Sequence, residues 1–97
     1  MKTLEEIRDI LIANMNTLKS QYKVKKIGVF GSYVRGRPKK KSDIDILVTF
    51  RGSVDFIEFL QLEEYLGILL GVKVDLVTKD ALKPYIGKRI LEEVVYV

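Results

Sequence analysis

Two carboxylates open an otherwise apolar, β-prone stretch of the sequence, SDIDILVTF over residues 42–50. In a strand, residues two apart lie on the same face, so Asp43 and Asp45 would stand side by side while Ile44 and Ile46 point the other way. Two carboxylates that close repel each other, and a positive group between them would relieve the repulsion. Mg²⁺ suits such a pair, because it takes one or two carboxylates and completes its coordination with water and substrate phosphates. The pair predicts a magnesium site at the start of a strand.

Two further features have the chemistry to complete such a site. Gly31 and Ser32 lie between an apolar run and a short helical turn, where a glycine lets a phosphate approach the backbone and free N–H groups favour an anion. Asp75 interrupts the run VKVDLV, and if its strand lies beside that of Asp43 and Asp45, it joins them on one face. Three carboxylates around two divalent cations would make a two-metal site for in-line displacement at phosphorus. Each feature alone also has a structural explanation: a turn, a cap, or an exposed position on a strand.

The residue types that the sequence lacks restrict the chemistry further. Its 97 residues include no cysteine and no histidine, which excludes disulfides, thiolate nucleophiles, histidine bases and the usual zinc sites. Catalysis would then rest on carboxylates, lysines, hydroxyls and the backbone. The net charge of +4 comes from basic residues clustered at 23–26 and 35–41. These clusters are either a solvated surface or an attraction for a polyanion, such as a nucleotide triphosphate or a nucleic acid.

Length and hydropathy predict one cytoplasmic domain over residues 1–97. A chain of this size can bury a single core without disulfides. No apolar run approaches the roughly 20 residues of a membrane span, and the N-terminus lacks the apolar segment of a secretory signal. We therefore expect no membrane partner.

Capping signatures and hydrophobic periodicity predict the elements that must position these residues. Thr3 with Glu6 begins a helix over residues 4–20, and Asp55 with Glu58 begins a second helix that ends before Gly71. The remaining predicted elements are strands over 23–30, 44–50 and 72–77, a helical turn over 32–36, a basic loop over 37–41, a helical region over 80–92 interrupted by Pro84 and Gly87, and a short edge strand over 94–97. This order predicts an α/β fold with a small mixed sheet and helices packed mainly on one side.

The combination of GSYVRG, a short basic loop, SDIDILV and VDLV resembles the nucleotidyltransferase superfamily related to DNA polymerase β. Within it the chain resembles the minimal nucleotidyltransferases, the MntA-like antitoxins, over nearly its whole length. The resemblance implies the polymerase β-like fold and two Mg²⁺ ions. It also implies a role for each motif residue: Gly31 and Ser32 bind the β- and γ-phosphates of the incoming nucleotide, Asp43 and Asp45 bind Mg²⁺, and Asp75 is the third carboxylate, which positions or deprotonates the attacking hydroxyl.

Three residues beside these motifs complete the comparison. Arg35 stands where the family commonly has a basic residue near the phosphates, a task that a guanidinium suits. Val34 replaces a small alanine that relatives often have, which affects packing under the short helix. Tyr33 and the basic loop over 37–41 are expected to shape the mouth of the site.

The resemblance implies an antitoxin that transfers AMP from ATP to a tyrosine of a partner HEPN ribonuclease toxin, with release of pyrophosphate. The chain has no room for a domain that would hold an acceptor, so we expect the acceptor to belong to another protein. Two alternatives stay open. The protein is either an antitoxin that acts by binding only, or a nucleotidyltransferase acting on RNA or a small molecule, although nothing in the sequence resembles a separate RNA-holding domain.

Overall fold

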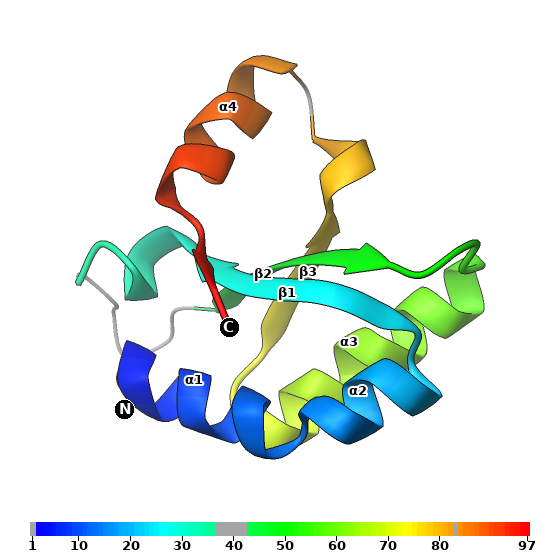
Figure 1. Ribbon diagram of the computed structural model, residues 1–97. Helices are drawn as coiled ribbons and strands as arrows, with labels where there is room; N and C mark the ends of the chain where they lie inside the picture. Colours follow the sequence, from blue (N-terminus) through cyan, green and yellow to red (C-terminus); the bar gives the residue numbers. More distant parts are fainter. Residues whose placement is uncertain (1, 37–42, 83) are drawn as a thin grey trace.

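The computed structural model describes residues 2–36, 43–82 and 84–97, and the predicted basic loop over 37–41 therefore lies outside the described residues. Figure 1 shows the arrangement of the elements. In chain order they are α1 (Leu4–Ala13), α2 (Met15–Gln21), β1 (Val24–Phe30), the 3₁₀ turn η1 (Gly31–Tyr33), β2 (Ile44–Phe50), α3 (Phe56–Leu70), β3 (Val74–Thr78), the 3₁₀ turn η2 (Lys79–Ala81), α4 (Pro84–Glu93) and β4 (Val95–Tyr96).

The strands form one mixed sheet in the order β3-β2-β1-β4. β1 runs antiparallel to both β2 and β4, whereas β2 and β3 are parallel and are joined through α3. A parallel pair needs such a crossover, because a tight hairpin can join only antiparallel strands. The predicted mixed α/β fold is confirmed.

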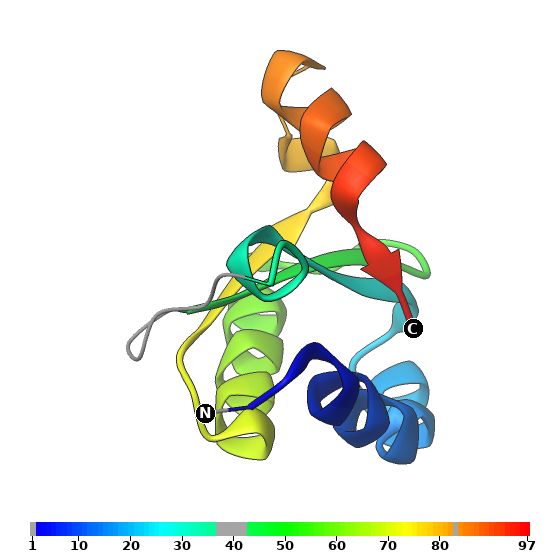
Figure 2. The same ribbon diagram turned by 90° about the vertical axis from the view of Figure 1, so that its left-hand side faces the viewer.

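One face of the sheet packs against α1, α2 and α3, which lie together on one side in Figures 1 and 2. Strand alternation sends every second side chain into this layer. Its central members are all buried: Ile7 and Leu11 of α1, Leu18 of α2, Ile27 and Val29 of β1, Ile44, Ile46 and Val48 of β2, Leu62, Leu66 and Leu70 of α3, and Val74 and Leu76 of β3. The prediction of helices mainly on one side is correct for these three.

Of the described elements, α4 and the turn η2 lie on the opposite side of the sheet (Figures 1 and 2). The chain then returns to the sheet as β4, beside Gly28 of β1. A side chain at Gly28 would press on β4, since an added Cβ would lie 2.7 Å from Val94 Cγ2 and 3.0 Å from Tyr96 Cδ1. The glycine therefore allows Val94 and β4 to pack closely against β1.

The predicted helix over residues 4–20 is in fact two helices that meet at Asn14, which has non-helical angles (φ −108°, ψ 12°). The Asn14 side-chain amide donates a hydrogen bond to the Ile10 carbonyl at 2.8 Å. Asparagine competes in this way with the regular backbone bonds of a helix. The apolar periodicity continues across the break, which is why the sequence pattern did not reveal it.

The outer edge of β3 is covered by a side chain from α3. Glu63 Oε2 accepts a hydrogen bond from the Leu76 N–H at 3.0 Å. Because β3 is an edge strand among the described residues, this N–H points away from β2 and toward no other described strand. α3 thus supplies both the core packing and a partner for an edge amide.

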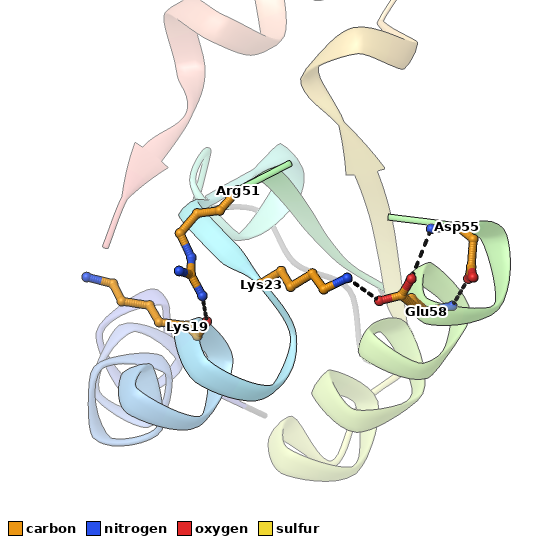
Figure 3. Close-up of polar contacts among 5 residues, drawn as sticks. All are labelled: Lys19, Lys23, Arg51, Asp55 and Glu58. Atoms are coloured by element: carbon orange, nitrogen blue, oxygen red, sulfur yellow. Dashed lines mark hydrogen bonds and ion pairs between the residues drawn. The ribbon is translucent and has the colours of Figure 1, made fainter. Parts of the chain in front are cut away.

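Figure 3 shows the polar contacts that connect the elements at the end of the sheet where β1 begins and β2 ends. The Arg51 guanidinium donates to the Lys19 carbonyl, which joins β2 to α2. Lys23 pairs with Glu58 at 3.1 Å, and Glu58 also belongs to the capping box of α3 with Asp55. The predicted capping box is confirmed.

Replacing Asp55 by Ala is expected to lower the free energy of unfolding by about 1 kcal/mol, because the Glu58 N–H loses its acceptor at 2.8 Å. Urea unfolding followed by circular dichroism measures this. The neighbouring Ser53→Ala variant is the control, since Ser53 is exposed and precedes the helix cap. Equal stability of the two variants would contradict the assignment of the cap.

Candidate active site

The fold brings two of the predicted carboxylates side by side. Asp45 of β2 and Asp75 of β3 are paired in the register of the parallel strands, and Phe30 of β1 is the partner of Asp45 on its other side. Asp43 lies directly before β2, two positions from Asp45, and is half-buried, whereas Asp75 is exposed. These carboxylates belong to the face opposite α1–α3, at the end of the sheet where β1 ends and β2 and β3 begin.

Burial and nearby carboxylates disfavour the charged form of Asp45 in the protein without a bound cation. Its pKa is raised from 3.8 to about 6, first by burial and then by the negative charges of Asp75 and Asp43. Arg35 opposes the shift, and Glu93 adds to it. A carboxylate in these surroundings is held in its charged form by a nearby cation.

Gly31 follows β1 directly, and its backbone position accommodates only glycine. Its φ is +83°, a left-handed value, and an added Cβ would collide with Asp45 Oδ2. The backbone at Gly31 therefore lies directly against the carboxylate. This contact brings the Gly-Ser motif and the Asp-x-Asp motif together at one end of the sheet.

The turn η1 continues from Gly31 with hydrogen bonds from the N–H groups of Val34 and Arg35 to its carbonyl, both at 3.1 Å. Ser32 is partly accessible and Arg35 is exposed, so both can reach a ligand. Tyr33 is only 5% exposed and belongs to the core. The expectation that Tyr33 shapes the mouth of the site is wrong, because its position in η1 turns the ring inward.

Glu93, at the end of α4, is a member of the site that the sequence analysis missed. Its Oε2 accepts a hydrogen bond from the Gly31 N–H at 3.2 Å, and its Oε1 lies 3.3 Å from Arg35 Nη1. The contact spans 62 positions of the sequence. The available signal was weak: an acid in the last turn of a helix, where the negative end of the helix dipole disfavours it.

The carboxylates fit Mg²⁺ by donor type and by charge, because hard cations prefer oxygen ligands and a cation would relieve the repulsion around Asp45. Within residues 2–36, 43–82 and 84–97, no three acidic side chains already stand at the spacing of a complete metal cage. Mg²⁺ does not need one, since water and substrate phosphates usually supply most of its ligands. Asp43, Asp45 and Asp75 are the residues that would hold it.

A cavity of about 1030 Å³ lies at the other end of the strands, away from these carboxylates. Its lining includes Lys25 and Lys26 at the start of β1, Thr49 at the end of β2, Phe56 of α3 and Tyr96 of β4. This cavity is therefore separate from the group of carboxylates at Asp43, Asp45 and Asp75.

A mixed sheet that places paired aspartates beside a glycine-serine turn defines a nucleotide-transferring class of protein, and sequence comparison agrees. Residues 15–97 match the family described as a nucleotidyltransferase domain, and the chain belongs to that family. It is 55% identical to the protein adenylyltransferase MntA of Thermococcus cleftensis over 97 residues, covering 100% of this chain and 98% of the relative.

Solved structures show the same fold. One, of a protein proposed to be a minimal nucleotidyltransferase, is 32% identical with a TM-score of 0.82, over 97% of this chain and 95% of that one. A toxin–antitoxin structure with AMP-PNP is 26% identical, with a TM-score of 0.70 over 98% and 72% of the two chains. A complex of tri-AMPylated Shewanella oneidensis HEPN toxin with MNT antitoxin is 25% identical, with a TM-score of 0.60 over 96% and 66%.

Proposed function

We propose that the protein is the antitoxin of a toxin–antitoxin pair and transfers AMP from ATP to a tyrosine of a partner HEPN ribonuclease toxin. The reaction depends on Mg²⁺ and releases pyrophosphate. Support comes from the relative named as a protein adenylyltransferase and from the structural relatives that contain a toxin, an ATP analogue or AMP groups. We further propose that the chain acts as one domain in the cytoplasm; among the described residues, no helix has the length and apolar character to cross a membrane.

The observation that carries this proposal is the contact between two motifs. The Gly31 backbone, which presents an N–H to an anion, lies against the Asp45 carboxylate, whose register partner is Asp75. An anion-binding amide beside clustered carboxylates suits a phosphate that arrives together with a cation. A site for a neutral ligand would not concentrate opposite charges in this way.

The residues divide the chemistry between them. Gly31 and Ser32 bind the β- and γ-phosphates, Arg35 stabilises their charge, and Asp43 and Asp45 hold the cation, which when bound neutralises the phosphates. Asp75 orients the tyrosine hydroxyl and accepts its proton. The tyrosine oxygen forms a bond to the α-phosphorus while the bond to the bridging oxygen breaks, and pyrophosphate leaves with that electron pair.

The test uses ATP labelled on the α-phosphate, Mg²⁺ and candidate HEPN toxins from the source organism, each purified separately. Wild type is expected to label the toxin. The double variant Asp43→Asn, Asp45→Asn is expected to label it at least about 10³-fold more slowly, because the transition-state charge is no longer neutralised. Mass spectrometry of the toxin then identifies the modified side chain.

The matched control is Asp9→Asn, Asp80→Asn, which makes the same change in charge at two exposed carboxylates outside the site. It is expected to label the toxin at the wild-type rate. Toxin that is inhibited but never labelled would replace the proposal with an antitoxin that acts by binding only. Label on RNA rather than on the toxin would identify an RNA nucleotidyltransferase.

A further inference from the structure

Glu93 occupies the groups that the proposed reaction assigns to the phosphates of ATP. One carboxylate oxygen accepts the Gly31 N–H at 3.2 Å, and the other lies 3.3 Å from the Arg35 guanidinium. An oxyanion with one oxygen on a backbone amide and the other on an arginine has the same contacts that a bound phosphate makes. The Glu93 side chain is 21% exposed, so solvent and ligands still reach it.

The position of Glu93 is otherwise unfavourable. It lies in the last turn of α4, a turn that has no basic residue, and an acid there opposes the helix dipole. Its charge also adds to the repulsion around Asp45. The contacts with Gly31 and Arg35 are therefore what favours the charged side chain at this place, and a stronger anion can compete for both.

We propose that Glu93 is an internal substitute for phosphate: it holds Gly31 and Arg35 in the nucleotide-free protein, and the triphosphate displaces it. This inference rests on the proposed function, because it concerns the contacts of Gly31 and Arg35 before ATP binds. It specifies a ligand class, polyphosphates, and a competing residue. It also couples nucleotide binding to the junction of α4 and β4, since Glu93 ends α4 and Val95 begins β4.

The test compares Glu93→Gln with Glu92→Gln by calorimetric titration, first with inorganic tripolyphosphate without metal and then with Mg-ATP. Glutamine keeps an acceptor for the Gly31 N–H but carries no charge, so the fold is expected to persist. Glu92 is exposed and makes the same change in charge one residue away. Glu93→Gln is expected to bind tripolyphosphate about tenfold more tightly than wild type, and Glu92→Gln within about twofold of it.

A second measurement follows the displacement directly in the wild type. On addition of tripolyphosphate, the backbone amide resonances of Gly31 and of residues 93–95 are expected to shift together, with one common midpoint. If Gly31 responds while residues 93–95 do not, Glu93 stays in place and the inference is wrong.

The remaining outcomes are equally decisive. If Glu93→Gln binds tripolyphosphate more weakly than the wild type, Glu93 is a positioning residue for Gly31 and Arg35. If it binds only Mg-ATP more weakly, Glu93 is a metal ligand. Either result overturns the inference. Absence of binding by every protein at millimolar ligand would overturn it together with the phosphate site. Suppose that Glu93→Gln binds tripolyphosphate more tightly but the wild-type protein transfers no AMP to the toxin. That result would uphold the inference and refute only the proposed function.

Discussion

Replacing Asp45 by Asn is expected to abolish AMP transfer and, in the absence of Mg²⁺ and nucleotide, to make the protein more stable. The wild-type carboxylate is half-buried among like charges, so its pKa in the folded protein is about 6 against 3.8 in the unfolded chain. Between these two values the folded state binds more protons than the unfolded state, and stability falls as the pH rises. Above the folded pKa the full cost of the charge is present, and Asn removes it.

The gain in stability should therefore depend on pH. At pH 7 to 8 we expect Asp45→Asn to exceed the wild type by about 1 kcal/mol, a figure that allows for solvent screening at this partly exposed site. Near pH 4 the two proteins should be almost equally stable, as urea unfolding at a series of pH values would show. Mg-ATP should reverse the order, since only the wild type is stabilised by binding it. A variant less stable than the wild type at every pH would refute this account.

Replacing Gly31 by Ala is expected to lower the free energy of unfolding by about 2–3 kcal/mol and to weaken the binding of Mg-ATP by more than about tenfold. Two effects combine at this residue: a left-handed backbone angle, and a Cβ that would collide with Asp45. The backbone must shift to relieve the collision. This shift moves the Gly31 N–H away from the carboxylates and so weakens the binding of phosphate. Unfolding curves and calorimetry on the same preparations measure both losses.

Gly36→Ala is a control that separates the two effects. Gly36 has a similar angle, φ +73°, but no atom of the described residues lies within 4 Å of an added Cβ. It should lose only the strain of the left-handed backbone, about 1 kcal/mol, and should bind Mg-ATP as the wild type does. If Gly31→Ala and Gly36→Ala behave alike, the contact between Gly31 and Asp45 has no part in nucleotide binding.

The sequence predicted most of the helices and strands, and it placed the aspartates at the starts of strands, because local signals determine both. The capping box at Asp55, the β-prone run after Asp43 and the interruption at Asp75 each depend on residues a few positions apart. In the parallel pair of β2 and β3, Asp45 and Asp75 are register partners. The buried apolar residues on either side of each aspartate favour this register. Residue roles remain predictions, because geometry alone shows proximity and not catalysis.

The contacts that escaped prediction depend on distant or competing interactions. The bond between Glu93 and Gly31 joins residues 62 positions apart, and no periodic pattern in the sequence predicts it. The break at Asn14 arises because one side-chain amide competes with a helical backbone bond, while the apolar pattern continues unbroken. Tyr33 shows a third cause: beside a polar motif its hydroxyl suggests a surface residue, yet its ring fills the core.

The hydrogen bond from the Leu76 N–H to Glu63 has a consequence for association between molecules. β3, which carries Asp75, is an edge strand of the sheet. An open edge is a template on which a strand of another molecule can add and begin a fibrous aggregate. Glu63 already accepts a hydrogen bond from the Leu76 N–H of β3, so an added strand could not form that backbone hydrogen bond. The charge of Glu63 also repels an approaching acidic segment. Association along this edge is therefore expected through side chains and not through added backbone pairing.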